Sequence, residues 1–120
     1  MSEHYELGKE GERIAEEYLV SNGYEILGRN LFFQKAELDI VAVKGKDLVF
    51  AEVKTRTQGS LMSPEQAVDR KKQRLLISAA AAFIEQEDLD LDARFDIISV
   101  IVDGKTHKID HLENAFYPTV

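Results

Sequence analysis

Apolar residues recur at helical spacing in two stretches of the chain and alternate, as they do in strands, in five others. The first helical stretch runs from about Glu6 to Asn22 and places Ile14 and Leu19 on one face. Asn22 and Gly23 both tolerate the left-handed backbone conformation that ends many helices. The pattern therefore predicts an amphipathic helix near the start of the chain.

The second helical stretch runs from Ser63 to about Glu87. Ser63 can act as the N-cap, Pro64 suits the first helical position, and Gln66 completes a capping box. A place in an active site is the other interpretation of Gln66. The apolar stripe of this helix is predicted to comprise Val68, Leu75, Leu76, Ala79 and Phe83.

Five segments show the alternation and the flanking turn residues of β-strands. They cover residues 24–33, 37–44, 47–56, 93–102 and 105–111. The first is expected to bend at Gly28, and Gly45-Lys46 is typical of a tight hairpin turn. The order α-β-β-β-α-β-β predicts an α/β fold in which helices flank a mixed five-stranded sheet. Without repeats or linkers, residues 1–120 are expected to form a single domain.

Four charged residues interrupt the second and third predicted strands. The tight turn gives a register in which the numbers of paired residues sum to 91. Asp39 then faces Glu52, Glu37 faces Lys54, and all four side chains lie on one face of the sheet. The opposite face is predicted to hold Leu38, Ile40, Ala42, Val49, Ala51 and Val53.

Two interpretations of this charged face are open. Asp39 and Glu52, with Cβ atoms roughly 5 Å apart, repel each other unless positive charge lies between them. A hard cation such as Mg²⁺ would bind their oxygens and a phosphate. Alternatively, Glu37 and Lys54 form a cross-strand salt bridge and the two acids point into solvent, as they would in a purely structural domain.

Composition narrows the class of protein. The 120 residues are 44% hydrophobic and 31% charged, as in ordinary globular proteins, and include no cysteine. Disulfides, thiolate metal sites and cysteine nucleophiles are therefore excluded. The first ten residues lack the apolar core of a signal peptide, and the richest apolar run, residues 75–84, is half of the ~20 residues that a membrane span needs. We expect a soluble, cytoplasmic protein without a membrane partner.

The formal net charge of −7 argues against general nucleic-acid binding, which depends on neutralising phosphates. The charge is unevenly distributed, however, because residues 85–92 are acidic and residues 54–56 and 69–74 are basic. The basic side chains could contact phosphates or simply face solvent. These candidates for nucleic-acid binding are Arg56, Lys71, Lys72 and Arg74.

The hairpin motif "ELDIVA…LVFAEVKTR" resembles the active-site hairpin of the restriction-endonuclease-like, PD-(D/E)XK superfamily. Nearly the full chain resembles the YraN-like family of small bacterial proteins, which are described as predicted endonucleases. Leu38 stands where that superfamily often has proline, a change that alters backbone stiffness but removes no ligand. Further matching segments are "GKEGERIAEEYL", "NGYEILGRN", "SPEQAVDRKKQRLL", "RFDIISV" and "HLENAF".

The resemblance implies roles for individual residues. Asp39 and Glu52 would bind Mg²⁺ or Mn²⁺ together with the backbone carbonyl of Val53. Lys54 would orient the attacking water or stabilise charge on the phosphate. Glu12 matches an acidic residue that related Holliday-junction resolvases place near the metal, often through water, although an exposed surface glutamate fits the same helical position.

The residues and the resemblance together predict a metal-dependent endonuclease that hydrolyses DNA phosphodiester bonds. A chain of this size has little surface for reading bases, which favours recognition of DNA shape, including branched DNA. A homodimer would place two sites against two strands. The alternative function is a non-catalytic nucleic-acid-binding or DNA-processing subunit that retains the nuclease fold.

Overall fold

A five-stranded mixed sheet forms the centre of the protein. The structure is a computed structural model that describes residues 3–59 and 68–118. Its elements are α1 (Glu3–Ser21), β1 (Glu25–Phe33), β2 (Ala36–Lys44), β3 (Asp47–Thr57), α3 (Arg70–Gln86), β4 (Asp92–Asp103) and β5 (Thr106–Phe116). The strands lie in sequence order, with β3 and β4 parallel and all other neighbours antiparallel. The predicted α/β fold and element order are confirmed.

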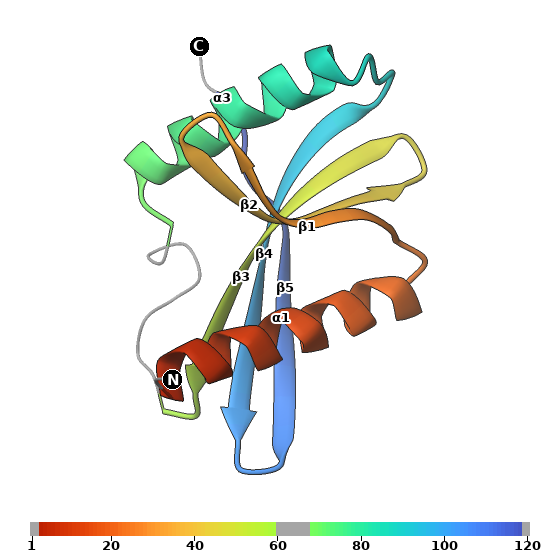
Figure 1. The fold of residues 1–120 in the computed structure, drawn as a ribbon. Coiled ribbons are helices and arrows are strands. Elements are labelled where there is room, and N and C mark those ends of the chain that lie inside the picture. The colour runs from red at the N-terminus through yellow and green to blue at the C-terminus, as the bar shows by residue number, and fades with distance from the viewer. Residues whose placement is uncertain (1–2, 60–67, 119–120) are drawn as a thin grey trace.

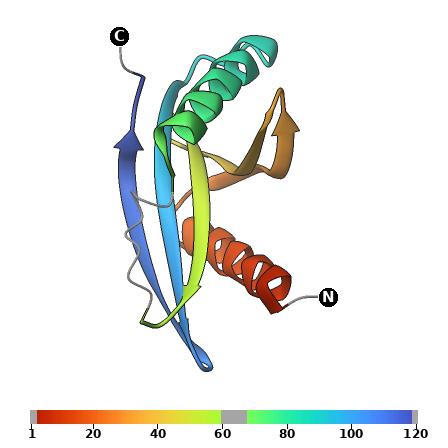
Figure 2. The same ribbon diagram turned by 90° about the vertical axis from the view of Figure 1, so that its left-hand side faces the viewer.

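The two helices cover opposite faces of the sheet. Strand alternation directs odd-numbered β3 residues such as Ala51 towards Ala15 and Leu19 of α1. Even-numbered residues such as Phe50 pack instead with Leu76 of α3. α3 lies over the upper part of the sheet and α1 over the lower part in both views (Figures 1 and 2). Within the described ranges, no helix is both long and apolar enough to cross a membrane.

The second helix begins later than the sequence predicts. α3 starts at Arg70, because Asp69 has an extended backbone and its carboxylate accepts a hydrogen bond from Lys72 N at 2.8 Å. An aspartate that caps a helix in this way ends it on the N-terminal side. The prediction of a continuous helix through Val68 is therefore wrong, although Val68 is fully buried. The predicted capping box lies outside the described residues, at Ser63, Pro64 and Gln66.

The register of the β2–β3 hairpin agrees with the sequence. The paired residues run from Lys44 opposite Asp47 to Ile40 opposite Ala51, and each pair of numbers sums to 91. Gly45 has a φ of 62°, which only glycine adopts readily, and this conformation lets the chain reverse within two residues. The turn therefore fixes which residues of the two strands face each other.

The outer strands depart from regular pairing. β1 shifts register between Ile26 and Gly28, where the sequence predicts a bend. β5 continues five residues beyond its predicted end, to Phe116 rather than residue 111. Asn114 adopts a left-handed φ of 52° within this extension. A strand that contains such a residue lacks a clear alternating pattern, which explains the short prediction.

Candidate metal centre

β2 and β3 separate at the acidic residues. Their last ladder pair is Ile40 with Ala51, so Asp39 and Glu52 lie one position beyond the paired region. Carboxylates placed directly opposite each other in a ladder repel. The two acids therefore stand at a fork between the strands, and each approaches the other from a different strand.

Beyond the fork, β2 pairs with β1 alone. Glu37 lies opposite Phe32 of β1, and not opposite Lys54 of β3. The predicted Glu37–Lys54 pair is therefore wrong, because the β2–β3 ladder on which it depends ends before these positions. Glu37 is exposed, and Lys54 turns to another carboxylate.

The alternation of β2 reverses at Asp39. Leu38 packs in the core under α3 together with Val41, whereas Ile40 packs in the core under α1. The prediction that Leu38 shares a face with Ile40 is wrong, since the strand twists between them. Asp39 lies at this twist and lines cavities towards both helices.

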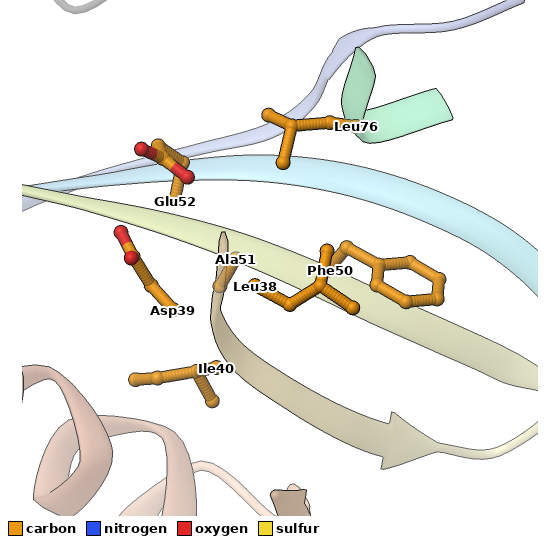
Figure 3. Close-up of a pocket in the computed structure, with 7 residues that line it drawn as sticks. All are labelled: Leu38, Asp39, Ile40, Phe50, Ala51, Glu52 and Leu76. Atoms are coloured by element: carbon orange, nitrogen blue, oxygen red, sulfur yellow. The ribbon is translucent and has the colours of Figure 1, made fainter. Parts of the chain in front are cut away.

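Glu52 is a buried carboxylate with 5% of its surface exposed. Figure 3 shows its carboxyl group close to that of Asp39, and both point away from the apolar side chains of Leu38, Phe50 and Leu76. Burying charged groups in such surroundings is unfavourable unless positive charge lies nearby. The pair therefore needs cations, either from the protein or from solution.

Asp39 titrates far from its ordinary range. Burial, followed by the charge of Glu52, raises the pKa of Asp39 to about 7. A hydrogen bond from Val53 N to Asp39 Oδ2, 2.9 Å long, opposes this shift, as does the charge of Lys72. Glu12 adds a further upward contribution. At neutral pH the two acids therefore share a site in which full ionisation of both is unfavourable.

Two lysines bring positive charge to Glu52. Lys54 Nζ lies 3.7 Å from Glu52 Oε1, and Lys72 Nζ donates a hydrogen bond to the same oxygen. Burial and the charge of Lys72 lower the pKa of Lys54. Burial also acts downward on Lys72, but its hydrogen bond to Glu52 and the charge of that carboxylate outweigh burial and raise its pKa.

Sequence reasoning assigned Lys72 only to phosphate contacts and missed its place beside the acids. Lys72 is separated from Glu52 by 20 positions and belongs to a different element. One signal could have found it: Lys72 precedes the buried Leu76 by one helical turn, so both side chains lie on the face of α3 that meets the sheet.

A cavity of about 260 Å³ opens at the acidic pair. Its polar lining comprises Glu37, Asp39, Glu52, Lys35 and Lys72, and its apolar wall comes from Ala36 and α3. The cavity lining therefore combines three carboxylates with two ammonium groups.

Glu12 reaches Asp39 from the opposite side. It is half-buried on α1 and lines, with Asp39, a second cavity of about 370 Å³. Glu12 therefore lies on the side of Asp39 that faces α1, and its charge acts on Asp39. Asp39 lines both cavities, one shared with Glu52 and the other with Glu12.

The donor atoms fit a hard divalent cation. Asp39 Oδ2 and Glu52 Oε1 accept the hydrogen bonds described above. Among the described residues, none donates a hydrogen bond to Asp39 Oδ1 or Glu52 Oε2. Carboxylate oxygens are the ligands that Mg²⁺ and Mn²⁺ prefer. Val53, through its carbonyl, and Glu12 are candidates for further coordination.

The other predicted phosphate contacts do not line the cavity at the acidic pair. Arg56 is half-buried on β3, two residues beyond Lys54 and on the same face. Lys71 and Arg74 are exposed on α3, and Arg74 lines a different cavity together with Tyr117. Of the four predicted basic contacts, Lys72 alone lines the cavity at Asp39 and Glu52 among the described residues.

Comparison with known proteins establishes the family. The model of an uncharacterised protein family, UPF0102, matches residues 11–100. The chain belongs to the UPF0102 family. It is 45% identical to a UPF0102 protein of Parabacteroides distasonis, covering 98% of this chain and 97% of that relative. Identities to UPF0102 proteins of Flavobacterium psychrophilum and Bacteroides thetaiotaomicron are 48% and 47%, with 98% of both chains covered in each case.

This UPF0102 chain has a second acidic cluster, in which ligand atoms of Asp96, His111 and Glu113 lie within 4.8 Å of one another. Arg94 donates to both oxygens of Asp96, at 3.0 and 2.8 Å. His111 Nε2 lies 2.7 Å from Oδ2, and Asn114 N donates to Oδ1 at 3.0 Å. These four contacts, from three residues, occupy the roughly four acceptor sites of a carboxylate. The cluster is therefore accounted for by the Asp96–Arg94 ion pair and the hydrogen bonds around it.

Proposed function

We propose that this UPF0102 protein is a metal-dependent nuclease of the restriction-endonuclease-like superfamily, which hydrolyses DNA phosphodiester bonds in the cytoplasm. The observation that carries the proposal is the pairing of a buried Glu52 with Asp39 at a strand fork, with Lys54 beside them. Two carboxylates beside an ammonium group are the kinds of side chain that metal-assisted phosphodiester hydrolysis uses.

Each residue has a defined task in this function. Asp39 and Glu52, with the Val53 carbonyl and Glu12, would hold Mg²⁺ or Mn²⁺, which polarises a phosphoryl oxygen and activates water when bound. Lys54 lies 3.7 Å from Glu52 and would orient the attacking water or stabilise negative charge on the phosphate. Burial lowers the pKa of Lys54, so its ammonium group holds its proton less tightly than a lysine in water does.

DNA is the proposed partner despite the overall negative charge. Positive charge concentrates where the substrate would lie, because Lys35 and Lys72 line the cavity and Arg56 follows Lys54 along β3. Local potential at the cleft, rather than net charge, governs the approach of a phosphate. We propose selectivity for DNA shape, such as a branch, and a homodimer that places two sites against two strands.

A second function is favoured by one specific observation. Lys72 hydrogen-bonds Glu52, so the protein partly neutralises its own acidic pair without an added cation. A non-catalytic DNA-processing subunit that keeps the fold would have the same hydrogen bond between Lys72 and Glu52. The two functions differ in whether DNA is cleaved.

The test is a cleavage assay on supercoiled, linear, flapped and four-way DNA with Mn²⁺. We expect cleavage by wild type to require the metal and to fall about 100-fold in Glu52→Gln and in Lys54→Ala, because the first removes an anionic ligand of the cation and the second removes positive charge from the phosphate. Cleavage that survives both substitutions would identify a contaminating nuclease. DNA binding without cleavage would instead favour the processing-subunit function.

Metal affinity is expected to depend on pH. The pKa of Asp39 is raised to about 7, so below this pH a proton occupies the group that the cation needs. Calorimetric titration should show Mn²⁺ binding about tenfold tighter at pH 8 than at pH 6, with release of a proton. Equal affinities at the two pH values would contradict the assignment of Asp39 as a ligand.

A further inference from the structure

Lys72 holds an unusual position in the acidic site. It lies in the first turn of α3, where Asp69 caps the helix by accepting a hydrogen bond from Lys72 N. The cap fixes the backbone of Lys72, and its side chain extends from there to Glu52 Oε1. The hydrogen bond is therefore a consequence of how the helix begins, and it joins α3 directly to the acidic pair.

Glu52 has two ammonium groups near one oxygen. Lys54 Nζ is 3.7 Å from Oε1, and Lys72 Nζ donates a hydrogen bond to that same atom. Asp39, in contrast, accepts its hydrogen bond from the backbone of Val53. Both ammonium groups therefore lie at Glu52, and a divalent cation would bind between Glu52 and Asp39.

Lys72 and a divalent cation would compete for the same place. Lys72 lines the cavity that Asp39 and Glu52 also line, and its charge acts on both acids. A cation bound between these carboxylates would repel an ammonium group at hydrogen-bond distance. The Lys72 side chain is 40% exposed and has a flexible four-carbon stem, so it can turn towards the cavity mouth.

We propose that Lys72 is a resident counter-ion of the metal centre. It neutralises Glu52 in the metal-free protein, leaves that carboxylate when the cation binds, and then contacts the substrate phosphate. This inference rests on the proposed nuclease function and adds to it a residue with two positions. Lys54 is the less exposed of the two lysines, with 33% of its side chain accessible against 40% for Lys72.

A purely structural role makes a different prediction. If Lys72 only pins α3 to the sheet, its removal lowers stability without improving metal binding. If Lys72 is a counter-ion, its removal leaves the acidic pair more negative and open to a cation. The direction of the change in Mn²⁺ affinity therefore separates the two roles.

The test compares Lys72→Met with wild type by calorimetric titration with Mn²⁺ in the absence of DNA. Methionine keeps much of the apolar stem and removes the charge. We expect Mn²⁺ to bind about fivefold tighter to Lys72→Met, since an ion pair of this exposure is worth a change of that order. Lys105→Met removes a lysine from the exposed β4–β5 turn and should leave the affinity unchanged. An unchanged or lower affinity in Lys72→Met overturns the proposal.

Cleavage should change in the opposite direction. At saturating Mn²⁺, single-turnover cleavage by Lys72→Met is expected to fall about 100-fold, because a cation at the phosphate is lost. Tighter metal binding together with unimpaired cleavage would overturn the proposed contact of Lys72 with the substrate phosphate.

If Lys72→Met does not fold, Lys72→Arg serves instead. Arginine binds a carboxylate with two parallel hydrogen bonds, so Mn²⁺ should bind to this variant more weakly than to wild type. Equal or tighter binding to Lys72→Arg would then overturn the proposal.

Asp39→Asn distinguishes a failure of this inference from a failure of the proposed function. Mn²⁺ binding that is present in wild type and lost in Asp39→Asn supports the metal centre, and an unaltered Lys72→Met then overturns the role of Lys72 alone. Absence of Mn²⁺ binding to wild type, with and without DNA, overturns both.

Discussion

Replacing Asp39 with asparagine is expected to stabilise the metal-free protein at high pH while it removes metal binding. The pKa of Asp39 is raised to about 7 in the folded chain, from an ordinary value of 3.8. An acid whose pKa is raised by folding does not destabilise the folded state below its unfolded pKa. The free energy of unfolding then decreases as the pH rises from the unfolded pKa to the folded pKa. Wild type should therefore lose stability between these values, and Asp39→Asn should not.

The size of this effect can be measured by urea unfolding in the presence of EDTA. Relative to wild type, Asp39→Asn should gain about 2 kcal/mol between pH 5 and pH 8. The asparagine oxygen can still accept the hydrogen bond from Val53 N, so the comparison isolates the charge. Glu37→Gln is the matched control: Glu37 lines the same cavity but is exposed, and its gain should stay below about 0.5 kcal/mol. A constant difference between Asp39→Asn and wild type at the two pH values would contradict the burial of this charge.

The same variant should bind Mn²⁺ at least about a hundredfold more weakly, since changes to the outer partners of a metal site alone can cost 10- to 100-fold. Stability and metal affinity would then move in opposite directions in a single variant. This combination is expected of a site whose charges are arranged for binding rather than for folding.

The part of the site that lies within one hairpin could be predicted from the sequence. The Gly45 turn and the alternation of apolar residues fix the register, and the register brings Asp39 and Glu52 together. These are short-range constraints, which a single sequence contains in full. The resemblance to Holliday-junction resolvases led to Glu12, and Glu12 and Asp39 line one cavity in the structure.

The errors lie where tertiary contacts override local pattern. Strict alternation places Leu38 with Ile40, but the strand reverses at Asp39, because β2 leaves β3 there and continues with β1. The same departure gives Glu37 a new neighbour, Phe32. Lys72 could not be placed from a strand pattern, since its contact with Glu52 depends on where α3 docks on the sheet.

Net charge was the least informative feature of the sequence. A value of −7 describes the whole surface, whereas the cavity at Asp39 carries both signs within a few ångströms. The interactions that decide whether a cation or a phosphate can bind act over this short range. Net charge therefore predicts weak general affinity for nucleic acid, but it does not predict which ligand the cavity binds.

Replacing Gly11 with alanine is expected to destabilise the protein by about 2 to 3 kcal/mol. A Cβ atom at Gly11 would lie 1.7 Å from Thr55 Oγ1 and 2.7 Å from Thr55 Cβ, because α1 crosses β3 at this point without an intervening side chain. Threonine is branched at Cβ and cannot turn aside freely, so the helix itself must move. Overpacking of this kind destabilises the folded protein by more than the higher helix propensity of alanine stabilises it.

Gly8→Ala is the matched control, on the same helix and with no atom within 4 Å of the added Cβ. It should stabilise the protein by up to about 1 kcal/mol, whereas Gly11→Ala should lower the melting temperature by about 10 °C. Thr55→Ala should recover part of the loss in a double-mutant cycle, with a coupling energy of about 1 kcal/mol or more. Additive effects would show that the two residues are not in contact.

Because Gly11 is next to Glu12, a shift of α1 would also move this carboxylate from the cavity at Asp39. Weaker Mn²⁺ binding by folded Gly11→Ala would then link the close approach of α1 to the metal centre.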